Sequence, residues 1–290
     1  LFINGYIWPI SSLGDLMLRP IGWDFLTFLF PLCLGAMTFL GGRSLNRWPK
    51  WLQTGSLSLA ILIVAGGVAA LNNLLPFHFN WLISLIGGGT VLLSWSALFL
   101  LGVVWAAPNH RFNPSFLICL ALFSGCILLI ESGGALWWRF QQPDLWGNFP
   151  NFHGHLQQSN GATCSPTAAA MLLHHYRIQA SEGEMAYLAG TSLFGSDAFA
   201  MARALDFKVR RQSGSALAEL ADYDQCVRRG EPFLAHIQGF GIGHAVLVKQ
   251  ATESEVMLVD PISGMERKIP RKDFEKGWNR TVVRVSWTRN

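Results

Sequence analysis

A cysteine and a glutamine six residues before it are the residues of this chain best suited to do chemistry. Cys164 opens the run Cys164-Ser165-Pro166-Thr167-Ala168-Ala169-Ala170, which favours a helix, and Gln158 precedes it. The unpaired N–H groups and the dipole at a helix N-terminus favour a thiolate over a thiol. The amide of Gln158 and the backbone N–H of Cys164 can bind the oxyanion that forms when a thiolate attacks a carbonyl. The pair therefore predicts nucleophilic acyl chemistry at Cys164.

Such a nucleophile needs a base and a group that orients the base, and His244 and Asp260 are the candidates. His244 follows the glycine-rich run at 239–243, whose backbone can approach a substrate closely. Asp260 ends the next predicted strand, and the short hairpin between the two strands places it beside His244. A carboxylate there fixes the tautomer of the imidazole and stabilises the imidazolium. Alone, each residue is explained as well by a buried histidine and an Asp-Pro turn; with Gln158 and Cys164, they predict a four-residue site.

The other histidines are less suitable as the base. His174 and His175 lie ten and eleven residues along the helix that Cys164 opens. At the rise of an α-helix they are about 15 Å from the sulfur, beyond hydrogen-bonding distance. His153 and His155 flank Gly154, but no further cluster of ligands accompanies this pair. The sequence therefore predicts neither a metal site nor a cofactor.

The five cysteines do not form a disulfide framework. Cys33, Cys119 and Cys126 lie in apolar runs, where cysteine usually behaves as a small buried hydrophobe. Cys164 and Cys226 are the two in the more polar half of the chain. A bond between them would remove the predicted nucleophile, so we expect both thiols to be free.

The composition divides the chain into two halves. Of the 290 residues 51% are hydrophobic and 14% are charged, and the mean hydropathy of +0.30 is high for an entirely soluble chain. Residues 1–149 hold 6 of the 22 Lys and Arg and 4 of the 18 Asp and Glu. The formal net charge of +4 is small and scattered, so no nucleic-acid partner is predicted. We therefore expect two domains, residues 1–145 and residues 146–290.

Long apolar runs fill the first half. They are roughly Trp23–Leu40, Gly55–Leu75, Trp81–Ala107 and Ser115–Trp138. Each is close to or above the roughly 20 residues that a transmembrane helix needs, and helices satisfy their own backbone polar groups in lipid. Charge is almost absent from the runs, which argues against transport. Residues 1–145 are therefore predicted to be a four-span transmembrane anchor, with the lipid bilayer as a partner.

The loop charges predict an orientation for this anchor. One side holds Arg43, Arg47, Lys50 and Arg111, and the other holds Arg19 and Arg139. Because basic loops stay in the cytoplasm, the first loop is predicted to be cytoplasmic and the second domain extracytoplasmic. The predicted location is the bacterial inner membrane. The sequence begins with Leu1 rather than Met, and an additional upstream span would reverse this topology.

The second half is predicted to be helical first and strand-rich later. Predicted helices are Cys164–Tyr176, a short helix after the capping box Ser181-x-x-Glu184, Ala198–Leu205 after Ser196-Asp197, Ala216–Arg229 and a short one within Arg271–Trp278. Predicted strands are Phe207–Arg211, Phe233–Gln238, His244–Gln250, Val256–Val259, Met265–Ile269 and Thr281–Trp287. A helical lobe that carries Cys164 would then pack on an antiparallel sheet that carries His244, with the site between them.

The order Gln158, Cys164, His244, Asp260 resembles that of the papain-like cysteine peptidases that process double-glycine leaders of bacteriocins, and of their stand-alone relatives. Other stretches that resemble the family are Cys164–Met171, Tyr176, Gly190-Thr191-Ser192, Gly243–Val248, Asp260-Pro261 and Phe274 with Trp278. The resemblance covers roughly residues 155–285 and none of the first half. It implies an α+β papain-like fold and a thiol protease that hydrolyses peptide bonds.

Carried over residue by residue, the resemblance implies four roles. Cys164 is the nucleophile, His244 is the general base and then the acid, Asp260 orients the histidine, and Gln158 lines the oxyanion hole. Many leader peptidases have Asp-Cys-Gly where this chain has Thr163-Cys164-Ser165. Such peptidases are also commonly fused to an exporter, whereas the printed sequence holds no Walker-type phosphate loop. A peptide or protein is therefore the expected substrate, and a separate exporter or secreted-peptide system is a candidate partner.

Two other functions are compatible with the same residues. An acyl or peptidyl transferase would use the same acyl-enzyme, with an amine in place of water in the second step. A catalytically inactive peptide-binding module on a membrane scaffold is the third reading. It is disfavoured because all four site positions hold residues that can do the chemistry.

Overall fold

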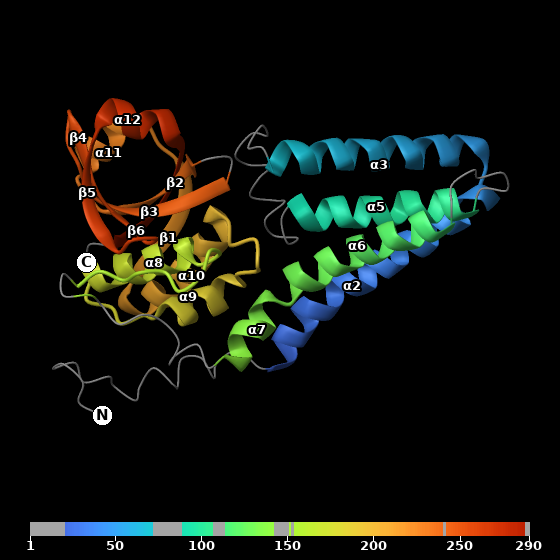
Figure 1. Ribbon diagram of the computed structural model, residues 1–290, viewed down its shortest axis with the longest axis horizontal. Coiled ribbons are helices and arrows are strands. Elements are labelled where there is room, and N and C mark those ends of the chain that lie inside the picture. Colours follow the sequence, from blue (N-terminus) through green and yellow to red (C-terminus); the bar gives the residue numbers. More distant parts are fainter. Residues whose placement is uncertain are drawn as a thin grey trace.

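The structure is a computed structural model that describes residues 21–71, 89–106, 114–141, 151, 154–239 and 242–287. An elongated helical region lies beside a region built on a sheet, and α7 lies where the two meet (Figure 1). The helical region contains α2 (Ile21–Ser44), η1 (Leu45–Arg47), α3 (Lys50–Leu71), α5 (Gly89–Ala106), α6 (Pro114–Ser132) and α7 (Gly134–Phe140).

Glycines bring α2 and α5 into close contact. A Cβ atom at Gly42 would lie 2.0 Å from the carbonyl oxygen of Phe99, and one at Gly102 would lie 2.1 Å from that of Phe39. Both distances are shorter than van der Waals contact, so a larger residue at either position would push the helices apart. The two glycines therefore set the spacing between α2 and α5.

The predicted membrane anchor is contradicted by these helices. Within the described ranges, no helix is both long enough and apolar enough to cross a bilayer. A span needs an unbroken apolar stretch of about 20 residues, and composition alone does not show where a helix breaks or which apolar side chains pack against other helices. The run predicted over Ser115–Trp138, for example, is divided into α6 and α7.

The prediction of a four-span transmembrane region and of an inner-membrane location is therefore wrong, and with it the basis for the bilayer as a partner. Some large apolar side chains of these helices are exposed, among them Phe30, Trp51, Leu62, Leu122 and Phe123. Arg19, Arg111 and residues 81–88 of the run at 81–107, on which that prediction also rests, lie outside the described residues.

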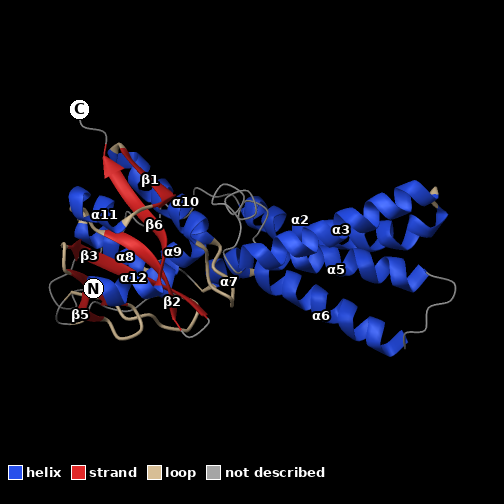
Figure 2. Cartoon of the chain, turned by 90° about the horizontal axis from the view of Figure 1, so that it is seen from above, coloured by secondary structure: helices blue, strands red, loops and turns tan. Residues whose placement is uncertain are grey.

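The second region is a six-stranded antiparallel sheet with helices on both faces. Its strands are β1 (Gly214–Leu220), β2 (Phe233–Gly239), β3 (Ile242–Ala251), β4 (Glu255–Asp260), β5 (Met265–Pro270) and β6 (Trp278–Trp287), in the order β1-β6-β2-β3-β4-β5. The helices are α8 (Cys164–His175), α9 (Glu182–Ala189), α10 (Ala198–Val209), η2 (Arg210–Gln212), α11 (Tyr223–Arg229) and α12 (Arg271–Gly277). Figure 2 shows the strands crossing this region. The predicted helical lobe on an antiparallel sheet is thus confirmed.

Two apolar clusters hold the helices to the sheet. Helices α8, α9 and α10 gather on one side of it (Figure 1), where Leu172 and Leu173 of α8 pack with Leu234 and Leu247 from the strands. On the other side α11 and α12 cover a second cluster that includes Phe274. All four leucines are at most 3% exposed. Because α8 is buried along most of its length, the packing of the helix fixes the position of its first residue, Cys164.

Two local predictions in this region are wrong. The helix predicted over Ala216–Arg229 is instead strand β1 followed by α11. Pairing decides this, because each residue of Gly214–Leu220 has a partner on β6, with Ala216 opposite Val285. The strand predicted over Phe207–Arg211 is instead the last turn of α10 and η2. The buried Val209 belongs to the helical cluster there.

Helix α7 joins the helical region to α9. Trp138 is 3% exposed and packs on Ala186 and Tyr187, and its Nε1–H donates to the carbonyl oxygen of Thr191 at 3.0 Å. Arg139 donates to the hydroxyl of Tyr187 at 3.1 Å. At Gly134 a Cβ atom would lie 2.6 Å from the same Thr191 oxygen. The first residue of α7 therefore has to be glycine for the helix to dock this closely.

We expect Gly134→Ala to weaken this docking and to lower the free energy of unfolding by about 1–3 kcal/mol, as overpacking does. Chemical denaturation and protease cleavage between α6 and α9 measure the change. Gly125→Ala in α6 is the matched control, because nothing lies within 4 Å of a Cβ atom there. That variant should be neutral or slightly stabilising. Equal effects of the two substitutions would show that α7 is not docked as described.

Candidate active site

Cys164 is the first residue of α8, and its side chain meets strand β3 at Ala245. The N-cap residue Thr163 makes no side-chain cap to the helix; its hydroxyl donates instead to the carbonyl oxygen of Asn160 at 3.0 Å. The N–H of Ser165 and that of Ala245 on β3 are directed at the Cys164 sulfur. The first turn of α8 thus leaves its N–H groups available to a negative charge on the sulfur.

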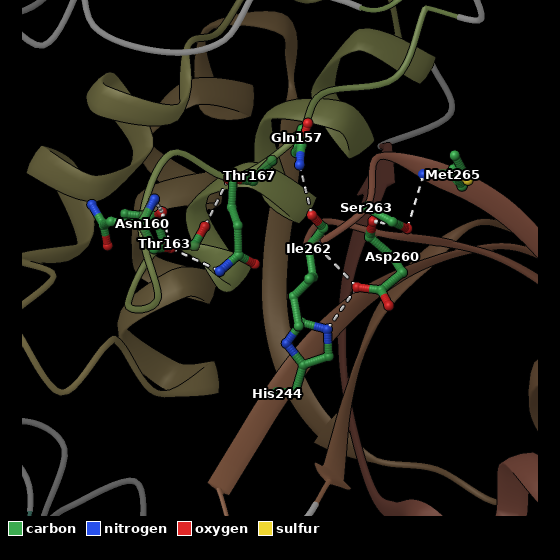
Figure 3. Close-up of polar contacts among 10 residues, drawn as sticks. Gln157, Asn160, Thr163, Thr167, His244, Asp260, Ile262, Ser263 and Met265 are labelled. Atoms are coloured by element: carbon green, nitrogen blue, oxygen red, sulfur yellow. Dashed lines mark hydrogen bonds and ion pairs between the residues drawn. The ribbon is translucent and has the colours of Figure 1, made fainter.

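His244 and Asp260 lie on neighbouring strands and touch. His244 Nε2 lies 2.9 Å from Asp260 Oδ1 (Figure 3). The same carboxylate oxygen accepts the N–H of Ile262 at 3.0 Å, which holds the carboxylate in place. The hairpin from β3 to β4 brings the two together, as its length predicted. Since Nε2 faces Asp260, the other ring nitrogen is the one that meets Cys164, with which His244 shares a hydrogen bond.

The charges of Cys164 and His244 stabilise one another. Burial alone would raise the pKa of the Cys164 thiol, but hydrogen bonds from His244 and Ala245 and the charge of the imidazolium lower it below its ordinary value. Burial alone would lower the pKa of His244, but hydrogen bonds with Cys164 and Asp260 and their negative charges raise it. The two shifts favour a thiolate beside an imidazolium.

Gln158 is held close to this site by its backbone and its amide. Its N–H donates to the carbonyl oxygen of Pro261 at 2.8 Å, and its Nε2 donates to that of Asn160 at 2.7 Å. Its Oε1 is buried without a hydrogen-bond partner among the described residues. A carboxamide nitrogen carries two hydrogens. One of them is used by Asn160, and the other remains for a ligand.

The remaining histidines take part in other contacts. His174 Nε2 lies 2.8 Å from the carbonyl oxygen of Ala180, and His175 packs edge-on against the ring of Tyr176. His155 lies 3.7 Å from Glu266, and His153 is outside the described residues. Within the ranges that the structure describes, no three or more His, Cys, Asp or Glu side chains gather as metal ligands would.

His236 on β2 is a half-buried neighbour of the site that the sequence did not single out. It lies opposite Ala245 on β3. Burial lowers the pKa of His236 to about 4, and the nearby charge of Asp197 acts in the opposite direction. The side chain is therefore neutral near pH 7 and leaves His244 as the charged imidazole of the site. No spacing or motif in the sequence marks it.

A family of known proteins matches this region. Residues 153–290 match the model of the Peptidase C39 family. An uncharacterized protein of Methanothermobacter marburgensis is 29% identical over 130 residues, which cover 45% of this chain and 86% of the relative.

Solved structures are similar to just under half of the chain. The peptidase domain of Streptococcus ComA, a bifunctional ABC transporter involved in quorum sensing, is 18% identical with a TM-score of 0.40, and the match covers 46% of this chain and 96% of that one. A double-glycine motif protease from an AMS/PCAT transporter, in complex with the leader peptide, is 21% identical with a TM-score of 0.40, covering 46% and 91%.

Residues 153–290 are a domain of the Peptidase C39 family. This part of the chain is accordingly a cysteine-type peptidase, and the resemblance that the sequence predicted is confirmed at that level. The family match covers neither α2–α6 nor α7, so it assigns no activity to the helical region.

Proposed function

We propose that the chain cleaves peptide bonds by attack of the Cys164 thiolate on a peptide carbonyl, with His244 and Asp260 as its partners. The observation that carries the proposal is a continuous series of contacts. The Cys164 sulfur shares a hydrogen bond with the imidazole of His244, and His244 Nε2 lies 2.9 Å from Asp260 Oδ1. The position of Cys164 at the start of α8 supports the same role. The lowered pKa of Cys164 supports it as well.

In this mechanism the sulfur adds to the carbonyl carbon of the scissile bond, and the π pair moves to the oxygen. A free N–H of Gln158 and the backbone N–H of Cys164 bind that oxyanion. His244, as the imidazolium, donates its proton to the leaving amine as the C–N bond breaks. A water molecule then gives a proton to His244 and attacks the thioester, which releases the acid and restores the thiolate. Asp260 holds the imidazole in the required tautomer throughout.

Two further features belong to the same proposal. The substrate is a peptide or protein, which the match to the Peptidase C39 family supports. The division of the chain near residues 145 and 146 is supported by a change in secondary structure: the described residues up to Phe140 form helices without strands, and those from Cys164 onward form helices and strands.

The reactivity of Cys164 toward iodoacetamide, followed as a function of pH, tests the proposal. Because the pKa of Cys164 is lowered, alkylation should stay fast at pH values where an ordinary cysteine is mostly protonated. His244→Ala removes a hydrogen bond and a positive charge that both lower this pKa, so the profile should move to higher pH. At pH values below the pKa of Cys164 in both chains, the rate should fall about tenfold for each unit of that move.

Cys226 is the internal reference in the same samples. It is buried, which raises the pKa of its thiol, so it should react slowly with and without His244. Peptide mapping by mass spectrometry separates the two sites. Alkylation of Cys164 no faster than that of Cys226, or an unchanged profile in His244→Ala, would contradict the proposal.

A further inference from the structure

A buried carboxylate on α9 binds Ser159, the residue that follows the proposed oxyanion-hole residue Gln158. Glu182 is 0% exposed and is the first residue of α9, after the N-cap Ser181. Its carboxylate accepts three hydrogen bonds from Ser159: from the backbone N–H to Oε1 at 3.0 Å and to Oε2 at 3.2 Å, and from the hydroxyl to Oε1 at 2.6 Å. A buried carboxylate is costly unless such bonds and a helix N-terminus compensate for the lost water. Glu182 is therefore firmly tied to Ser159.

Ser159 belongs to a short segment that is fixed from both lobes. On the sheet side, the N–H of Gln158 donates to the carbonyl oxygen of Pro261, and Gln157 Nε2 donates to that of Ile262 at 2.9 Å (Figure 3). On the helical side, Glu182 holds the next residue along the chain. The backbone of Gln158 thus lies between two anchors, and the direction of its amide depends on both.

We propose that Glu182 is a positioning residue of the peptidase site, which acts through Ser159 to aim the Gln158 amide at the oxyanion. The inference rests on the proposed function and assigns to α9 a part in it. One Gln158 hydrogen is bound by the Asn160 carbonyl oxygen at 2.7 Å. The direction of the second hydrogen on Gln158 Nε2 depends on the segment at 157–160, which Glu182 holds through Ser159. An oxyanion donor has to lie within a few tenths of an ångström of its place to be effective.

A neighbouring carboxylate on the same helix has a different arrangement. Glu184 is also buried, but its side chain lies 2.5 Å from Lys208 on α10, and its N–H is bound by Ser181. That pair joins α9 to α10 rather than to the segment at 157–160. Glu184→Gln is thus a matched control for the loss of a buried carboxylate without the proposed positioning role.

Two reagents distinguish an effect on the Cys164 nucleophile from an effect on the oxyanion hole. With iodoacetamide the Cys164 thiolate displaces iodide at a saturated carbon, so no oxyanion forms. With p-nitrophenyl acetate the sulfur adds to the carbonyl carbon and the π pair moves to oxygen; the C–O bond then breaks, and p-nitrophenolate leaves with its electron pair. We expect Glu182→Gln to slow this acylation about 10–100-fold, after subtraction of the rate in Cys164→Ala, while alkylation of Cys164 is unchanged. Glu184→Gln should change neither rate selectively.

A double-mutant cycle tests whether Glu182 acts through the glutamine. Glu182→Gln should have no further effect on acylation in a Gln158→Ala background, since the group that it positions is absent. Should Glu182→Gln fail to fold, Ser159→Ala removes only the hydroxyl bond and should show a smaller loss with the same selectivity.

The outcomes distinguish this inference from the proposed function. Any of three results would overturn the positioning role. Glu182→Gln could be acylated at the wild-type rate, it could lose acylation and alkylation equally, or its loss could add to that of Gln158→Ala in the double mutant. If wild-type Cys164 itself is alkylated no faster than Cys226 and is not acylated, the proposed function fails, and the positioning role fails with it.

Discussion

Replacing Cys164 with alanine is expected to lower kcat/KM for peptide cleavage by about 10⁴-fold or more, because the bond-forming atom is lost. Cleavage is measured by mass spectrometry on a randomised peptide library, first with the wild-type chain to find the peptides that are cut fastest. Alanine removes the sulfur from the start of α8 but leaves the buried face of that helix intact. The loss should therefore come without a loss of stability.

Cys126→Ala is the matched control, because Cys126 is an exposed cysteine of α6. That variant should cleave the same peptides at the wild-type rate. Peptide cleavage that persists in Cys164→Ala, at the same bonds, would show that another group is the nucleophile.

Replacing His244 with alanine should also have a large effect and lower kcat/KM for peptide cleavage by about 10³-fold or more. Two functions are lost together. The thiolate loses the hydrogen bond and charge that lower its pKa, and the leaving amine loses its proton donor. The same selected peptides and assay apply.

Asp260→Asn is compared with His244→Ala as a milder change to the same pair of side chains. It keeps the size of the side chain near Nε2 but removes the negative charge that contributes to the raised pKa of His244. It should therefore cost activity, but less than His244→Ala, and the alkaline limb of its pH profile should move to lower pH. A loss in Asp260→Asn as large as in Cys164→Ala, with an unchanged profile, would contradict the orienting role.

Much of the site could be predicted because its signals are local. A cysteine before the run Ala168-Ala169-Ala170 predicts its own place at the helix start, and α8 does begin at Cys164. The hairpin between β3 and β4 is short enough for spacing alone to bring Asp260 to His244. In both cases, the geometry follows from the secondary structure of a few neighbouring residues.

Other features depend on partners that are distant in sequence. Gly214–Leu220 becomes a strand through its pairing with β6, some seventy residues away, which outweighs its helical pattern. The bond of Glu182 to Ser159 links residues 23 apart, and no spacing rule marks it. The apolar runs of the first half predict membrane spans because composition does not show where helices break or how they pack.

The most direct test of the account is to trap the acyl-enzyme. Wild-type chain mixed with p-nitrophenyl acetate and quenched in acid within the burst should carry one acetyl group on Cys164, located by peptide mapping, and the acetyl group should be absent from that position in His244→Ala at the same time point. An acetyl group on other residues but not on Cys164, or on Cys164 equally in both chains, would contradict a nucleophile activated by His244.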